Sequence, residues 1–135
     1  MSVIEDHLTG ASVLIVDDDG WNIFALLSYL EASGLNVMSA ESGAEALDLI
    51  VRWRPQIILM DIMMPKMDGF ETIAHIRSMP SVAEVPIIAV TARAMKGDRE
   101  RCLGAGASDY VSKPVNMQEL LNKMAELLKN NDGSY

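Results

Sequence analysis

Residues 13–19 read VLIVDDD, an apolar run that ends in three consecutive acidic residues. An uninterrupted apolar run is typical of a parallel strand that helices cover on both faces. Two more runs share this pattern, IILM at 57–60 and IIAV at 87–90. We therefore predict that these three runs form the inner strands of a sheet.

Short strands alternate with longer amphipathic stretches five times along the chain. We predict strands near 11–16, 35–40, 57–60, 87–90 and 108–112, each followed by a helix, as in βα units around a parallel sheet. The second and fifth strands contain polar residues, which suits the edges of the sheet. With right-handed crossovers, this pattern predicts an α/β fold with a doubly wound five-stranded parallel sheet, order 2-1-3-4-5, and helices on both faces.

The helix boundaries are marked by capping residues. Three pairs have capping-box spacing: Ser42 with Glu45, Asp68 with Glu71, and Asn116 with Glu119. Gly34 and Gly106 are predicted helix stops. We expect a single domain over residues 1–135, with a core of about 11–129 and loose ends over about the first ten and last six residues.

The overall composition excludes several functional classes. The 135 residues carry a net charge of -8, which argues against nucleic-acid binding because phosphate contacts need clustered Lys and Arg. No apolar run reaches the roughly 18 to 20 residues of a membrane span, and the N-terminus lacks the order of a secretion signal. Cys102 has no second cysteine to pair with, which favours a small buried thiol. We expect a soluble, cytoplasmic protein in a reducing compartment.

Charged and polar side chains follow the predicted strands at their carboxyl ends. Asp17 and Asp18 follow the first strand, Asp61 the third, Thr91 the fourth and Lys113 the fifth. Because ligands bind at this edge of a doubly wound sheet, we expect all five side chains to converge on one crevice. Carboxylates so close together repel each other unless a cation lies among them, and oxygen ligands suit Mg²⁺. Together with the lysine and the hydroxyl, such a site suits a phosphoryl group.

Four motifs, in order along the chain, resemble those of the response-regulator receiver domain of two-component signalling. They are VLIVDDD at 13–19, LMDIMMPKMDG at 59–69, AVTA at 89–92 and DYVSKP at 109–114. The resemblance covers nearly the whole chain. It implies a flavodoxin-like fold and a phosphorylation-dependent signalling switch, which catalyses only its own phosphorylation and slow dephosphorylation. It also implies a histidine kinase or a histidine phosphotransfer protein as the donor.

The resemblance assigns the metal site and the acceptor residue by residue. It implies that Asp61 is the phosphoacceptor and also a ligand of Mg²⁺. Asp18 would bind the ion directly, and Asp17 mainly through water. The backbone carbonyl of Met63 would complete the protein ligands.

The resemblance also assigns the residues that would hold the phosphoryl group and report its arrival. Lys113 would pair with phosphoryl oxygens, while Thr91 and the amide of Ala92 would hold another oxygen. Tyr110 would be the aromatic residue that turns as Thr91 moves. The signal would leave through the fourth helix, fifth strand and fifth helix to a downstream protein, or by onward phosphoryl transfer. A cis bond is implied between Lys113 and Pro114.

Some positions vary among receivers. Asn22 matches receivers of hybrid kinases, which often have Pro in place of Gly20, and many receivers have Phe in place of Val115. These departures do not touch the phosphoryl chemistry. The resemblance implies that Met63 and Arg93 occupy the two positions that, in the family, tune how fast the phosphoaspartate hydrolyses. We hypothesise that the bulky Met63 shields it from water.

Other readings of the same residues stay open at this point. Asp17, Asp18 and Asp19 could cap the first helix instead. Trp21, three residues after Asp18, is expected near the predicted metal site; alternatively, it packs against the first loop. A haloacid-dehalogenase-like Mg²⁺ phosphatase also uses an aspartyl nucleophile, but it needs a second Asp two residues after Asp61. An unphosphorylated docking module is disfavoured because the acceptor, metal and lysine positions are all occupied.

Overall fold

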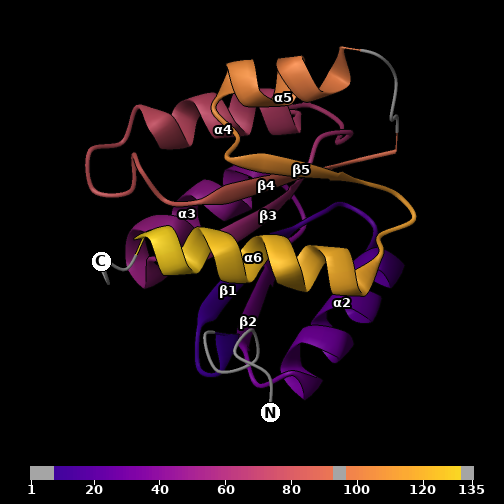
Figure 1. The fold of residues 1–135 in the computed structure, drawn as a ribbon. Coiled ribbons are helices and arrows are strands. Elements are labelled where there is room, and N and C mark those ends of the chain that lie inside the picture. Colours follow the sequence, from indigo (N-terminus) through magenta and orange to yellow (C-terminus); the bar gives the residue numbers. More distant parts are fainter. Residues whose placement is uncertain (1–7, 93–96, 132–135) are drawn as a thin grey trace.

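The fold was examined in a computed structural model, which describes residues 8–92 and 97–131. Its centre is a five-stranded parallel sheet with the order β2-β1-β3-β4-β5 (Figure 1). The strands are β1 Ser12–Val16, β2 Asn36–Ala40, β3 Ile57–Asp61, β4 Ile87–Thr91 and β5 Asp109–Ser112. The structure thus confirms the predicted doubly wound sheet, including the two edge strands.

Helices pack on both faces of the sheet, as predicted. They are α2 Gly20–Ala32, α3 Gly43–Trp53, α4 Gly69–Arg77, α5 Asp98–Ala105 and α6 Met117–Asn131. One buried cluster joins α2 and α6 to one face, and a second joins α3, α4 and α5 to the other. In Figure 1, α6 runs across the front of the sheet. We call these the α2/α6 face and the α3–α5 face.

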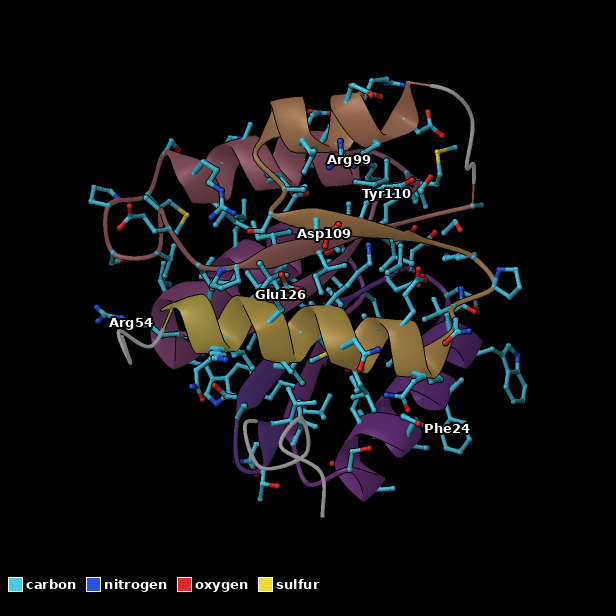
Figure 2. All side chains as sticks on the ribbon, viewed as in Figure 1. Phe24, Arg54, Arg99, Asp109, Tyr110 and Glu126 are labelled. Carbon is cyan, nitrogen blue, oxygen red and sulfur yellow. The ribbon has the colours of Figure 1, made fainter. Side chains whose placement is uncertain are left out.

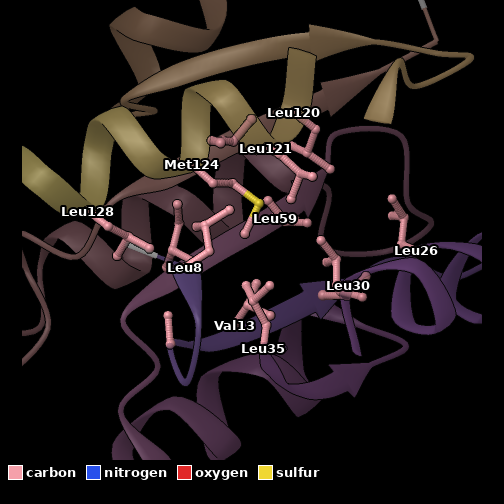
Figure 3. Close-up of a cluster of buried hydrophobic side chains, with 14 of the residues drawn as sticks. Leu8, Val13, Leu26, Leu30, Leu35, Leu59, Leu120, Leu121, Met124 and Leu128 are labelled. Atoms are coloured by element: carbon pink, nitrogen blue, oxygen red, sulfur yellow. The ribbon is translucent and has the colours of Figure 1, made fainter. Parts of the chain in front are cut away.

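The first cluster extends the core toward the N-terminus beyond the predicted limit. Leu8 is only 1% exposed and packs in this cluster with Leu59 and Met124, as Figure 3 shows. The amide of Ala11 donates to the carbonyl of Leu8 at 2.9 Å, which turns the chain into β1. The expectation of ten loose residues is therefore wrong from Leu8 onward. A single leucine among polar residues has no periodicity that reveals its burial.

The predicted helix caps are present. Ser42 Oγ accepts from the amide of Glu45 at 3.1 Å, and the side chain of Glu45 accepts from the amide of Glu41 at 3.1 Å. The other two caps accept from the amide three residues on, each at 2.9 Å: Asp68 from Glu71 and Asn116 from Glu119. The predicted stops at Gly34 and Gly106 have positive φ angles of 94° and 116°. These caps and glycines set the helix boundaries and therefore the loops next to the strand ends.

Candidate functional site

Three carboxylates meet at the carboxyl ends of β1 and β3. Asp17 directly follows β1, and Asp61 is the last residue of β3; the two residues are 2% and 3% exposed. One oxygen from each of Asp17, Asp18 and Asp61 lies within 4.8 Å of the others. The structure therefore brings together the three carboxylates that the sequence predicted to converge.

Lys113 supplies positive charge to this cluster from the end of β5. Its Nζ lies 3.5 Å from Asp61 Oδ1 and 3.6 Å from Asp17 Oδ2. The backbone holds the lysine in place, because the amide of Lys113 donates to the carbonyl of Thr91 at 2.8 Å. The bond between Lys113 and Pro114 is cis, as the resemblance implied. One ammonium thus serves two buried carboxylates.

Burial and the surrounding charges disfavour the ionised form of Asp61. Burial and the neighbouring charge of Asp17 raise the pKa of Asp61 from 3.8 to about 6. Lys113 and a hydrogen bond from the amide of Met63, at 3.2 Å, lower the pKa and offset part of this rise. A site with this excess of acidic oxygen fits a hard divalent cation. The residues present therefore suit Mg²⁺.

The loop after β3 is held close to the acceptor strand by a glycine. The amide of Gly69, at the start of α4, donates to the carbonyl of Ile62 at 3.0 Å. A Cβ at position 69 would lie 2.5 Å from the carbonyl oxygen of Asp61 and 2.6 Å from Ile62 Cα. Only glycine allows this approach without a shift of the backbone. Between these points the loop exposes Met63, whose surface is 54% accessible.

Strand alternation divides the predicted site residues between the two faces of the sheet. Asp61 lies two and four residues after Leu59 and Ile57, which belong to the α2/α6 cluster, and residues at this spacing share a strand face. Thr91 lies at the same spacing from Ala89 and Ile87 of the α3–α5 cluster and is 4% exposed. Thr91 therefore belongs with the residues two and four positions before it on β4, and the convergence of all five predicted side chains on one crevice stays a prediction.

Two separate hollows follow this division. On the α2/α6 face, a groove of about 210 Å³ is lined by Asp17, Lys113 and Asn22 among others. On the α3–α5 face, a cavity of about 380 Å³ is lined by Thr91, Met63 and other residues. Asp17 and Lys113 thus border the first hollow, and Thr91 and Met63 border the second.

The remaining predicted residues lie around the site. Asp19 caps α2 by accepting from the amide of Trp21 at 2.9 Å, so the capping alternative holds for this aspartate. Trp21 is 83% exposed, which argues against packing on the first loop. Ala92 is exposed after β4, and Arg93 lies outside the described residues. Cys102 is buried as predicted, and burial raises the pKa of its thiol.

Sequence reasoning did not single out Lys123. On α6, this lysine contacts Asp109 and Tyr110 of β5, which lie 14 and 13 residues before it. No spacing rule for a helix or strand links residues so far apart, and only the packing of α6 beside β5 brings them together. A signal was present only in the polar character of the fifth strand.

Comparison with known proteins decides the family. The response-regulator receiver domain matches residues 13–125. The chain belongs to this family. Its members are phosphoacceptor regulators, so this receiver domain is not an enzyme for a separate substrate, and a histidine kinase is implied as its partner.

Relatives extend this result to nearly the whole chain. The polar-differentiation response regulator DivK of Brucella anthropi is 38% identical over 117 residues, which cover 87% of this chain and 95% of DivK. The receiver domain of a Francisella response regulator is 29% identical, with a TM-score of 0.84 over 90% of this chain and 98% of that one.

A third relative bears on the metal. The receiver domain of a sensor histidine kinase from Pseudomonas aeruginosa is 36% identical, with a TM-score of 0.83 over 90% of this chain and 99% of that one. That structure has a magnesium ion coordinated in its active-site cleft. The acidic cluster of this receiver domain resembles such a site.

Among the described residues, no helix has the length and apolar character needed to cross a membrane.

Proposed function

We propose that this receiver domain accepts a phosphoryl group on Asp61 from a histidine kinase or a histidine phosphotransfer protein. The observation that supports this is the position of Asp61, a buried carboxylate between two others and 3.5 Å from Lys113 Nζ. In the transfer, the P–N bond of the donor's phosphohistidine breaks and a P–O bond to Asp61 forms. The electron pair of the broken bond stays on the histidine nitrogen. The cytoplasmic location predicted from the sequence is part of the same proposal.

The carboxylates of Asp17, Asp18 and Asp61, with the carbonyl of Met63, are the proposed ligands of Mg²⁺. The three carboxylates fit the ion because their oxygens approach within 4.8 Å of one another. When bound, Mg²⁺ supplies the positive charge that the carboxylates and the incoming phosphoryl oxygens share. The Pseudomonas receiver with its bound magnesium supports this assignment.

Lys113 and Thr91 are proposed to hold the phosphoryl oxygens from two directions. Lys113 already lies beside the acceptor oxygen, so its ammonium can pair with a phosphoryl oxygen after a small movement. Thr91 ends the adjacent strand β4 but belongs to the α3–α5 face. In this proposal its hydroxyl and the amide of Ala92 move toward the new charge. This movement would carry the signal from one face of the sheet to the other.

Tyr110 is proposed to follow Thr91. Tyr110 pairs with Ala89 in the β4–β5 register, and Thr91 lies two residues beyond Ala89 on the same face. The small side chain of Ala89 leaves the ring of Tyr110 a path toward the space that Thr91 vacates. The surface formed by α5, β5 and α6 changes as the ring turns, and a downstream protein reads the change, or the phosphoryl group is relayed onward.

Intact-mass measurement after incubation with acetyl phosphate and Mg²⁺ tests the proposal. We expect the wild-type chain to gain one phosphoryl group, and Asp61→Asn or removal of Mg²⁺ with EDTA to abolish the gain. An unmodified wild-type chain would contradict the proposal and favour a docking module. Repeated turnover of small phosphate esters would instead favour the phosphatase alternative. An equal gain by Asp61→Asn would place the acceptor elsewhere.

A further inference from the structure

Lys123 of α6 makes three contacts with two neighbouring residues of β5. Its Nζ donates to Asp109 Oδ1 at 3.1 Å and to the carbonyl oxygen of Tyr110 at 2.9 Å. The same nitrogen lies 5.4 Å from the centroid of the Tyr110 ring. Asp109 Oδ1 also accepts from the amide of Tyr110 at 2.8 Å. The ammonium of Lys123 therefore contacts the backbone and the ring of Tyr110, the residue proposed to turn, and the side chain of its neighbour Asp109.

The position of β5 makes these contacts possible. β5 is an edge strand, and Asp109 and Tyr110 point to opposite sides of it because successive side chains alternate. Figure 2 shows Asp109 on the side of β5 that faces α6 and Tyr110 on the side that faces α5. Lys123 comes from the α6 side and still approaches the ring. The ring must therefore lie toward the open edge of the sheet, where it is partly exposed.

The ammonium cannot follow the ring when the ring turns. Two oxygen acceptors, one on Asp109 and one on the backbone of Tyr110, hold Lys123 Nζ at the edge. Neither acceptor moves with the side-chain torsions of Tyr110. A ring that turned toward Thr91 would leave the cation behind and lose the contact with it. The attraction between cation and ring therefore favours the edge orientation alone.

We propose that Lys123 is a positioning residue that holds the Tyr110 ring at the sheet edge and so sets the resting balance of the switch. The proposal rests on the proposed function, since it assigns a restraint to the residue that reports phosphorylation. An exposed cation–π contact changes a two-state ratio by about two- to five-fold. Removal of the ammonium should raise the ratio of inward to edge conformers by that factor.

Fluorine NMR of the Tyr110 ring measures this ratio directly. The chain has three tyrosines, so Tyr29→Phe and Tyr135→Phe leave Tyr110 as the one site for 3-fluorotyrosine. In this background we would compare Lys123→Met, which keeps the aliphatic stem, with Lys123→Arg, which keeps a cation. Lys129→Met is the matched control, because Lys129 lies exposed on the same helix. Spectra are recorded first without any phosphoryl donor or mimic.

We expect Lys123→Met to raise the ratio of inward to edge conformers about two- to five-fold, with Lys123→Arg and Lys129→Met close to the parent. In the presence of Mg²⁺, the beryllofluoride concentration that half-saturates the protein should fall by the same factor. A ligand that binds the inward state no longer has to break the contact between Lys123 and the ring. A merely structural role for Lys123 would lower the thermal midpoint without moving either quantity. Equal populations in Lys123→Met and Lys129→Met would overturn the proposal, as would an equal shift in Lys123→Met and Lys123→Arg.

The outcome is separable from the fate of the proposed function. If Asp61 is modified normally and Lys123→Met matches its control, the restraint alone is refuted. If no donor modifies Asp61 and Lys123→Met still shifts the ring, the proposed function fails and the restraint stands.

Discussion

The two faces of the sheet meet at the same strand ends and differ sharply in character. On the α2/α6 face, Asp17 and Asp61 are buried beside Lys113, so charge is concentrated there. On the α3–α5 face, Thr91 lines a cavity that also includes apolar residues, and Tyr110 packs at the edge. Under the proposed function, the acceptor and the ring proposed to report phosphorylation therefore lie on opposite sides of one sheet.

The first test removes one residue from each face of the sheet. Lys113→Met should slow phosphoryl uptake from acetyl phosphate about 100-fold or more, because a charge that neutralises the transferring group is lost. Thr91→Val, of similar shape, should retain most of the uptake but uncouple it from Tyr110. Intact mass against time measures uptake, and fluorine NMR of Tyr110 measures coupling. Equal losses of uptake in the two variants would erase the distinction between the faces.

The second test measures how much stability the metal-free protein loses when the buried carboxyl of Asp61 ionises. Because the folded pKa of Asp61 is about 6 and its ordinary value is 3.8, the folded state binds the extra proton more tightly. The resulting stabilisation is complete below about pH 4 and is lost as pH rises through about 6. Asp61→Asn should therefore be more stable than wild type at pH 7, by at most about 3 kcal/mol, and similar to it near pH 4.

Urea unfolding in EDTA at several pH values measures this difference. At pH 7, Mg²⁺ should reduce the difference in free energy of unfolding between Asp61→Asn and the wild type. A cation that binds only the folded state stabilises the wild type. Parallel pH profiles for the two proteins would show that Asp61 ionises as freely in the fold as in the unfolded chain.

The third test perturbs the backbone that joins the two faces. Gly69→Ala should destabilise the fold by about 2 kcal/mol, because its Cβ would meet the backbone of Asp61 and Ile62 at 2.5 and 2.6 Å. Gly104→Ala is the control: it lies in α5 with no atom within 4 Å of its Cβ position and should stabilise by about 1 kcal/mol. Thermal or urea unfolding measures both. A Gly69→Ala protein as stable as wild type would mean that the β3–α4 loop yields freely.

The smallest expected effect concerns the lifetime of the phosphoryl group. Met63 stands on the exposed loop after Asp61, and its amide donates to the acceptor oxygen. Met63→Asn should speed dephosphorylation about five-fold, which corresponds to about 1 kcal/mol in the barrier, because a polar side chain admits water where the thioether excludes it. Decay of the phosphorylated mass measures the rate. An unchanged rate would remove Met63 as a shield and leave the loop without a part in hydrolysis.

Local patterns were enough to predict most of the elements. The apolar runs at 57–60 and 87–90 became buried inner strands because a strand covered on both faces must be apolar throughout. Asp68 became a cap because its carboxylate accepts from an amide only three residues away. The convergence of Asp17, Asp61 and Lys113 was also predictable, since parallel strands bring their carboxyl ends to one edge.

The strands, caps and acidic strand ends could therefore be predicted from the amino-acid sequence, because these depend on residues within a few positions of one another or on the direction of the strands. The burial of Leu8 in the core and the approach of Lys123 to Tyr110 around the sheet edge could not be predicted in this way. Each of these depends on which surfaces pack together. That choice is made by side-chain burial over the whole fold, and no local spacing records it.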